Sequence, residues 1–423
     1  MAEGTRRPAW AGIDLAAIRH NAAVLASIAA PARLCAVVKA DAYGHGATEV
    51  ARAALAGGAS ELAVALVDEG VELREAGIDA PILVLSEPGP DAMTEVYSYG
   101  LVPTVYTEDG LAGAANAARA LASRAPASRA PALPAGGRLP VEIKVDTGMH
   151  RVGADPGCVV QLVAGLVDRL ELGFGGLWTH LAVADEPERG ATAEQLGCFE
   201  AVRESLRAAG LAPPQRLHAA NTAGAIAWPS ARFDMVRCGI GLYGYSPSRA
   251  VAPALASEVV AAGWEDGLRP ALSWAARVSM VRELEAGERV SYGLRQPLPA
   301  RSLVATVPLG YADGIPRSYF TGGGVVLVNG RRRPLAGTVT MDQILVDCGD
   351  DSRVSAGDEV VLIGEQGDER LTADDWADVL GTISYEVVTR IGPRVRRVYH
   401  GGCGPAPATG AAESGPGEAG RGR

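Results

Sequence analysis

Lys39 is the residue whose type and position most clearly suggest chemistry. It directly follows the apolar run 34–38, at the exit of a candidate strand. A lysine in such a position is partly desolvated, which lowers its pKa and frees the amine to form a Schiff base. For one lysine taken alone, a side chain that reaches from apolar surroundings to water is the commoner case. The position of Lys39 at a strand exit, together with the segments described next, favours the Schiff base here.

Two further segments have the features of a phosphate site. Asn221-Thr222 and Cys238-Gly239-Ile240 each begin a predicted helix or turn. The free N–H groups of a helix N-terminus bind phosphate, although an ordinary helix cap is the commoner role for either segment alone. Together with Lys39 they predict one phosphate-binding cup beside a Schiff-base lysine.

A parallel sheet would bring these residues together. In the first 242 residues, short apolar runs alternate with helical patterns, and Asp14 is placed to cap the first long helix. Eight such strands suffice to close a β/α barrel, in which polar residues at the carboxyl ends of the strands form the catalytic mouth. An open doubly wound sheet would give the same alternation, but the glycine-rich dinucleotide turn is missing. The candidate strands are 34–38, 62–66, 82–85, 101–105, 141–145, 174–179, 216–219 and 235–237.

From about residue 272 the pattern becomes β. Asn329-Gly330 between two strand-like runs is a strong hairpin signal. Further strands are expected at 290–292, 303–307, 344–347 and 359–363, with one helix from Thr372 to Leu380. The sequence therefore predicts an α/β protein in which an eight-stranded TIM-type barrel precedes a mostly antiparallel β domain.

The expected domain limits follow from these patterns of strands and helices and from composition. We expect the barrel at 12–250, with a Pro- and Ala-rich insertion loop at 122–138, and the β domain at 251–400, with residues 1–11 packed on it. The tail 404–423 holds no apolar residue larger than Ala, so we expect it to be disordered.

Composition excludes several classes of function. The formal net charge is −10 and no long basic run occurs, which disfavours nucleic-acid binding. No charge-free apolar stretch is long enough to span a bilayer, and no signal-peptide core precedes the first strand. The six cysteines lack zinc or disulfide-scaffold spacing, so no metal site is expected. These features predict a cytoplasmic protein.

The segment Val37-Val38-Lys39-Ala40-Asp41-Ala42-Tyr43-Gly44-His45-Gly46 resembles the pyridoxal-phosphate attachment signature of the alanine racemases. Eight more segments resemble that family in order, so the resemblance covers about residues 10 to 400. They are Lys144 to Met149, Thr179 to Ala182, His218 to Gly224, Val236 to Ile240, Val290 to Gly293, Leu309 to Gly314, Thr340 to Gln343 and Thr382 to Glu386.

The resemblance implies a set of residue roles. Lys39 would hold pyridoxal 5'-phosphate as a Schiff base and act as one catalytic base. Tyr292 would be the other base, reaching the site from the second subunit of a homodimer. Arg151 and the backbone N–H of Met341 would bind the substrate carboxylate, and Tyr311 and Asp342 would form the entrance. The remaining cofactor contacts would come from Tyr43, His180, Asn221, Thr222, Arg237, Gly239, Ile240 and Tyr385.

Racemisation explains why these residue types are needed. The α-proton leaves one face of the amino acid and a proton returns on the other, so two bases on opposite faces suffice. The resemblance places Arg237 against the pyridine nitrogen, with His180 orienting it. Since arginine keeps its proton, that nitrogen would stay unprotonated. We infer that this restrains the side reaction of transamination. The implied activity is interconversion of L- and D-alanine, which supplies D-alanine for peptidoglycan synthesis.

Other interpretations remain open at this stage. A decarboxylase for a basic amino acid would share the fold, but the presence of Tyr292, Arg151 and Met341 together favours a racemase. A racemase for serine or a larger amino acid differs only in pocket volume. A pyridoxal-phosphate carrier protein would lack the second domain, and a cofactor-free Schiff-base aldolase would show no pyridoxal absorbance. One departure from the family pattern is His150, where many members have glycine.

Overall fold

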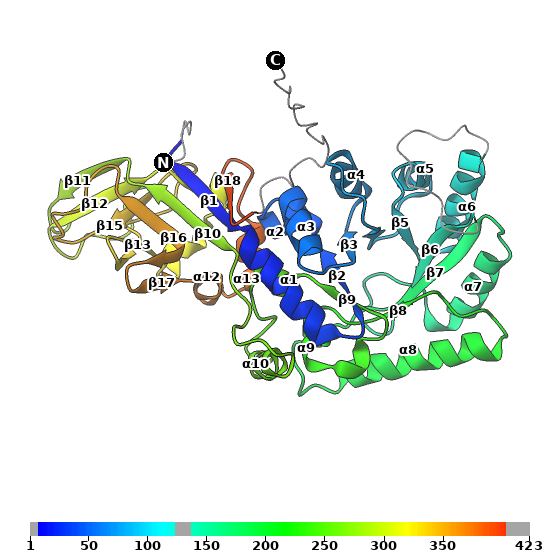
Figure 1. The fold of residues 1–423 in the computed structure, drawn as a ribbon. Coiled ribbons are helices and arrows are strands. Elements are labelled where there is room, and N and C mark those ends of the chain that lie inside the picture. Colours follow the sequence, from blue (N-terminus) through cyan, green and yellow to red (C-terminus); the bar gives the residue numbers. More distant parts are fainter. Residues whose placement is uncertain (1–6, 123–136, 403–423) are drawn as a thin grey trace, which may run out of the picture.

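The computed structural model describes residues 7–122 and 137–402. Most of the expected insertion at 122–138 and the whole tail at 404–423 therefore lie outside the described residues. The described chain forms two parts, a β/α barrel and a β-rich C-terminal part, which lie side by side (Figure 1). No helix among the described residues has the length and apolar character needed to cross a membrane.

The barrel strands are parallel and confirm the predicted eight-stranded sheet. Their order is β8-β7-β6-β5-β4-β3-β2-β9. The two end strands approach each other, because the Asp234 N–H donates to the Leu217 carbonyl (3.1 Å) and the Arg237 N–H donates to the Ala220 carbonyl (2.9 Å), which nearly closes the barrel. The strands are β2 (Arg33–Val37), β3 (Glu61–Val64), β4 (Ile82–Val84), β5 (Val102–Val105), β6 (Leu139–Lys144), β7 (Leu172–Trp178), β8 (Leu217–His218) and β9 (Met235–Cys238).

Helices connect successive barrel strands, as the alternation predicts. The Asp14 carboxylate accepts hydrogen bonds from the N–H groups of Ala16 and Ala17 and so caps α1, as expected from the sequence. The helices of this part are α1 (Leu15–Ala29), α2 (Lys39–Gly44), α3 (Ala47–Ala56), α4 (Val67–Glu75), α5 (Met93–Ser98), α6 (Glu108–Ala122), α7 (Val159–Val167), α8 (Ala191–Ala208), α9 (Thr222–Ala227) and α10 (Ala252–Ala261).

The C-terminal part contains two mostly antiparallel sheets, which confirms the predicted class. One has the order β14-β13-β16-β10-β1-β18, with β17 beside β16, and the other is β11-β12-β15. Its strands are β1 (Ala9–Asp14), β10 (Leu272–Arg277), β11 (Met280–Leu284), β12 (Ser302–Val307), β13 (Val325–Val328), β14 (Arg331–Pro334), β15 (Ile344–Asp347), β16 (Glu359–Gln366), β17 (Glu369–Leu371) and β18 (Arg396–His400), and its helices include α12 (Ala373–Leu380) and α13 (Ser384–Thr389).

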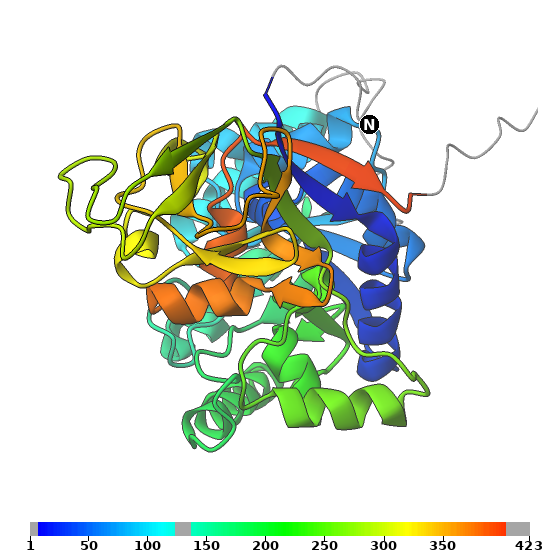
Figure 2. The same ribbon diagram turned by 90° about the vertical axis from the view of Figure 1, so that its left-hand side faces the viewer.

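The first strand of the chain belongs to this C-terminal sheet. β1 pairs with β10 antiparallel and with β18 parallel, and only then does the chain enter the barrel through α1. Figure 2 shows β1 crossing the C-terminal part before it continues into α1. Residues from both ends of the sequence thus share one sheet beside the start of the barrel.

Two local predictions in this part have different outcomes. The hairpin is confirmed, since Asn329 and Gly330 join β13 to β14 with φ of 51° and 70°. The strand expected at 290–292 is wrong, because Ser291 has a φ of 62° and the segment is a loop. The loop is held by Thr338, whose hydroxyl donates to the Tyr292 carbonyl (3.0 Å) and whose carbonyl accepts from the Ser291 hydroxyl (2.5 Å).

Candidate active site

Lys39 begins a left-handed turn at the end of β2. The four residues after it, Ala40 to Tyr43, have φ between 52° and 53°. Non-glycine residues in this conformation cost about 1–2 kcal/mol each, and such strain is found where the surroundings hold the backbone for a purpose. Here Glu69 accepts from the Ala40 N–H (2.6 Å), and Asp41 accepts from the Ala47 N–H (2.8 Å). The turn fixes where Lys39 and Tyr43 leave the backbone.

Lys39 lies among other cations. Burial, followed by the positive charge of Arg151, lowers the pKa of Lys39, while Glu69 acts in the opposite direction. Burial and the charges of Arg237 and Arg151 lower the pKa of Lys144 to about 8. Arg151 is exposed and forms no hydrogen bond or ion pair within the described part of the chain. The mouth of the barrel therefore has an excess of positive charge that suits an anionic ligand.

Arg237 is the most firmly held of these cations. It is 3% exposed, and its guanidinium donates to the Thr179 carbonyl (2.8 Å) and the Ala219 carbonyl (3.1 Å). The guanidinium carbon lies 4.6 Å from the centre of the Trp178 ring. The family resemblance implies that His180 orients Arg237, and the Nδ1 of His180 lies 3.4 Å from Arg237 Nη2. A second histidine is closer, because the Nδ1 of His218 accepts from Arg237 Nη1 at 2.6 Å.

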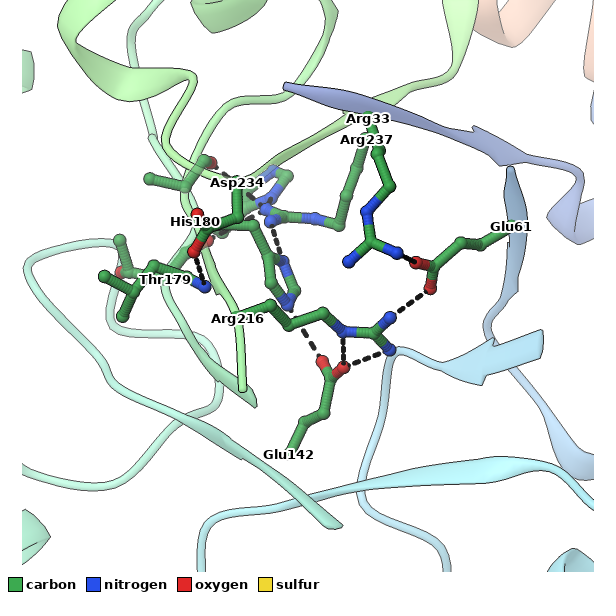
Figure 3. Close-up of polar contacts among 11 residues, drawn as sticks. Arg33, Glu61, Glu142, Thr179, His180, Arg216, Asp234 and Arg237 are labelled. Atoms are coloured by element: carbon green, nitrogen blue, oxygen red, sulfur yellow. Dashed lines mark hydrogen bonds and ion pairs between the residues drawn. The ribbon is translucent and has the colours of Figure 1, made fainter. Parts of the chain in front are cut away.

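His218 joins Arg237 to a cluster of charged residues inside the barrel, in which Figure 3 labels Glu142, Arg216 and Glu61. The Nε2 of His218 lies 2.9 Å from Glu142 Oε2, and Glu142 is bound in turn by Arg216. Arg216 also donates to Glu61 (2.5 Å). Sequence reasoning missed this role of His218 and the cluster behind it. The signal was a charged residue two positions before Lys144, inside an otherwise apolar strand.

The predicted phosphate cup is assembled around Gly239. The Gly239 N–H donates to the Thr222 hydroxyl (3.0 Å), and a Cβ at Gly239 would lie only 2.4 Å from Tyr43 Oη. Asn221 caps α9 by accepting from the Gly224 N–H (2.9 Å). Hydroxyl and backbone donors thus meet at a point where any side chain would intrude. This donor set, next to the excess positive charge, fits a ligand that bears a phosphate.

Tyr43, Tyr385 and Ile240 complete the wall of this cup. Burial raises the pKa of Tyr43 to about 12 and also raises the pKa of Tyr385, so both phenols are neutral hydrogen-bonding groups. Their ring centres are 6.2 Å apart, which brings α13 of the C-terminal part against the turn after Lys39. Ile240 is buried and begins the short turn that follows Gly239.

Apart from Tyr385, the site residues predicted in the C-terminal part have exposed side chains. Tyr292 is 71% exposed and Met341 is 52% exposed. No hydrogen bond, ion pair or ring contact between described residues joins Tyr292 to the barrel. Tyr311 and Asp342 lie on neighbouring loops, where the Tyr311 N–H donates to the Thr340 carbonyl (2.9 Å) and Arg394 donates to Asp342 (2.6 Å). One copy of the chain therefore presents these side chains on its surface.

Arg397 in β18 connects the C-terminal part to the turn after Lys39. Its Nε donates to the Gly44 carbonyl (2.9 Å), and its remaining donors bind the carbonyls of Ile391, Gly392 and Val395 at 2.6 to 2.8 Å. One guanidinium thus joins the end of the strained turn to the segment that precedes β18.

Comparison with known proteins agrees with this arrangement. The family model for the N-terminal domain of alanine racemase matches residues 13–247, and that for the C-terminal domain matches residues 271–399. The alanine racemase of Symbiobacterium thermophilum is 45% identical over 397 residues, which is 93% of this chain and 98% of that protein.

Solved structures are similar over nearly the whole chain. Alanine racemase from Streptomyces lavendulae superposes with a TM-score of 0.82 at 37% identity, covering 95% of this chain and 99% of that one. A histidine racemase from Leuconostoc mesenteroides is also similar, with a TM-score of 0.79 at 28% identity, covering 94% of this chain and 99% of that one. On both domain models and on full-length relatives, this chain belongs to the alanine racemase family.

Proposed function

We propose that the protein interconverts L-alanine and D-alanine with pyridoxal 5'-phosphate bound at Lys39, and that it works in the cytoplasm to supply D-alanine for peptidoglycan. The observation that carries the proposal is the half-buried Lys39 amine on a strained turn, beside both an anion-binding cup and Arg151, which has no partner among the described residues. When bound, the cofactor supplies an electron sink that makes the α-hydrogen of the amino acid acidic.

The residues around Lys39 have separate tasks in this proposal. Arg237 would face the ring nitrogen with support from His180. The phosphate end would be held by Tyr43, Asn221, Thr222, Gly239, Ile240 and Tyr385. Arg237 has donors only, so the ring nitrogen next to it stays an acceptor and carries no proton. Arg151 and the backbone N–H of Met341 receive the substrate carboxylate, which fixes the amino acid with its α-hydrogen toward a base.

The proton transfers need two bases on opposite faces. Lys39 serves one face, and Tyr292 of the partner subunit serves the other. The exposure of Tyr292 supports a homodimer with shared sites, because a base on the surface of one copy reaches a barrel only in a second copy. Tyr311 and Asp342 would then narrow the entrance to the partner's barrel.

Chiral chromatography of L-alanine incubated with the purified protein and pyridoxal phosphate tests this function. D-alanine should accumulate until the two enantiomers are equal. A yellow protein that forms no D-alanine would retain the cofactor assignment and reject alanine as the substrate. A colourless, inactive protein would reject the Schiff base at Lys39. The Lys39→Ala variant provides the control, since its pigment should not survive denaturation.

A racemase for a larger amino acid is the second candidate. It is favoured by the similarity to the histidine racemase structure at 28% identity. The same chromatographic assay with serine, histidine and lysine separates the two candidates, since the alanine proposal requires alanine to have the highest kcat/KM of the panel.

A further inference from the structure

Charged side chains lie together in the interior of the barrel and are joined to Arg237 through His218. Glu142 is fully buried, and its Oε1 accepts from Arg216 Nε at 2.5 Å. Arg216 reaches Glu61, which is 2% exposed, at 2.5 Å. Figure 3 shows Arg216 between the carboxylates of Glu142 and Glu61, with Arg33 also directed at Glu61. Glu61 therefore faces two arginines, and Glu142 faces Arg216 and His218.

The direction of each hydrogen bond fixes the protonation of His218. Arg237 offers only N–H donors, so the Nδ1 of His218 that faces it at 2.6 Å must accept. The ring proton therefore sits on Nε2, which donates to Glu142 Oε2 at 2.9 Å. Burial and the two arginines lower the pKa of His218 to about 4, which agrees with a neutral ring.

Glu142 is anionic, because a protonated carboxyl group could not accept hydrogen bonds from both Arg216 and His218. Burial alone would raise its pKa, but the contacts with His218 and Arg216 outweigh burial and lower the pKa to about 2. Its two oxygens are divided between partners, with one oxygen taken by Arg216 and the other by His218. Both oxygens must accept for Arg216 and His218 to be satisfied together.

We infer that Glu142 is a positioning residue that acts through His218: by accepting the Nε2 proton it leaves Nδ1 free to accept from Arg237, and so sets the direction of the guanidinium. The inference rests on the proposed function, in which Arg237 faces the ring nitrogen of the cofactor. The chain Glu142–His218–Arg237 then determines how firmly the ring nitrogen is held without a proton.

The Glu142→Gln variant tests this inference because it changes one oxygen to an amide and keeps the shape. The amide oxygen should turn to the cationic Arg216, which leaves the amide NH2 group facing His218 Nε2. That nitrogen must then accept, the ring proton moves to Nδ1, and two donors oppose each other at Arg237. Glu61 and Arg216 remain paired in this variant.

The first measurement is the tautomer of His218 by nitrogen NMR of protein labelled with 15N-histidine, assigned with a His218→Asn variant. The unchanged protein should show a bare Nδ1 and a protonated Nε2, and Glu142→Gln should lose this pattern. Glu61→Gln is the matched control, since it neutralises a buried glutamate of the same cluster that does not touch His218, and it should keep the pattern. A protonated Nδ1 in the unchanged protein would overturn the inference without any variant.

The second measurement is the ratio of racemisation to side transamination in the cofactor-loaded protein. Glu142→Gln should lower kcat for racemisation by roughly 10-fold to 100-fold through misplacement of Arg237, and raise the transaminated fraction, with little change in KM. A structural role alone would give Glu61→Gln the same ratio as Glu142→Gln, which would overturn the inference. If the unchanged protein binds the cofactor but racemises nothing, the proposed function fails, while the tautomer measurement still tests Glu142.

Discussion

The hydroxyl of Tyr43 occupies the space beside Gly239 where a side chain would stand, since a Cβ at Gly239 would lie 2.4 Å from Tyr43 Oη. Glycine is therefore required at this position by the close approach of Tyr43.

Gly239→Ala should weaken binding of pyridoxal phosphate by displacing the Tyr43 hydroxyl. Loss of one hydrogen bond to a charged group is worth about 1.5–3 kcal/mol, or roughly 10-fold to 100-fold in Kd. An absorbance titration of the apoprotein measures the change. Gly197→Ala is the control, because that glycine lies in α8 and a Cβ there meets no atom within 4 Å. Equal affinity for the cofactor in both variants would contradict the proposed cup.

Arg397→Ala should loosen the turn that carries Lys39. It removes the donors to Gly44 and to three carbonyls of the C-terminal part, and the unpaired carbonyls should lower the free energy of unfolding by about 1–3 kcal/mol. Attachment of the cofactor to the apoprotein should also slow. Urea denaturation and the rate of yellow colour formation measure the two effects.

Neighbouring and conservative variants sharpen the test of Arg397. Arg396→Ala alters an exposed side chain of the same strand and should change neither quantity. Arg397→Lys should recover little of the stability and attachment rate that Arg397→Ala loses, because one ammonium group cannot reproduce the planar set of guanidinium donors. Full rescue by lysine would show that charge alone matters at this position.

The rate of cofactor attachment should depend on the pKa of Lys39. The neutral amine is the nucleophile, so the rate rises with pH and levels off above that pKa. Burial and Arg151 lower the pKa of Lys39 below the ordinary value of about 10.4, so the plateau should begin at lower pH than for a free lysine. Arg151→Gln removes a positive charge that disfavours the ammonium form, which raises the pKa and moves the profile to higher pH.

Stopped-flow absorbance of apoprotein mixed with pyridoxal phosphate between pH 6 and 10 gives this profile at constant ionic strength, with the range chosen to extend about four units below the ordinary lysine pKa. Arg189→Gln is the control, since Arg189 is exposed and pairs with Glu186 on the surface. A shift of the Arg151→Gln profile to lower pH would have the wrong sign for the electrostatic explanation.

Mixed subunits should regain activity if the site is shared. Lys39→Ala and Tyr292→Phe should each be inactive alone. A heterodimer of the two has one site with both residues intact, so random exchange should restore about a quarter of the unmutated activity. Lys39→Ala mixed with Arg237→Ala should stay inactive, because both changes lie in the barrel and every heterodimer site would carry one of them. Absence of recovery after proven exchange would reject the cross-subunit role of Tyr292.

The sequence by itself determined the features that depend on near neighbours. Apolar runs of strand length, separated by helical patterns, predicted all eight barrel strands to within a few residues. Asp14 and Thr372 predicted their helix starts, because a cap bonds to N–H groups only two or three residues away. Asn329-Gly330 predicted the hairpin for the same reason, since the turn is set by the φ preferences of two adjacent residues.

Only the tertiary structure decided the contacts between distant residues. Arg216 and Glu61 are 155 positions apart, and each alone has the pattern of a solvated charge. Their pairing depends on barrel closure, which brings the inward-facing sides of β3, β6 and β8 to the same interior layer. The loop at 290–292 and the left-handed turn after Lys39 also departed from local preference. Both are held by residues far along the chain, and no sequence pattern within a few residues of either segment indicates those partners.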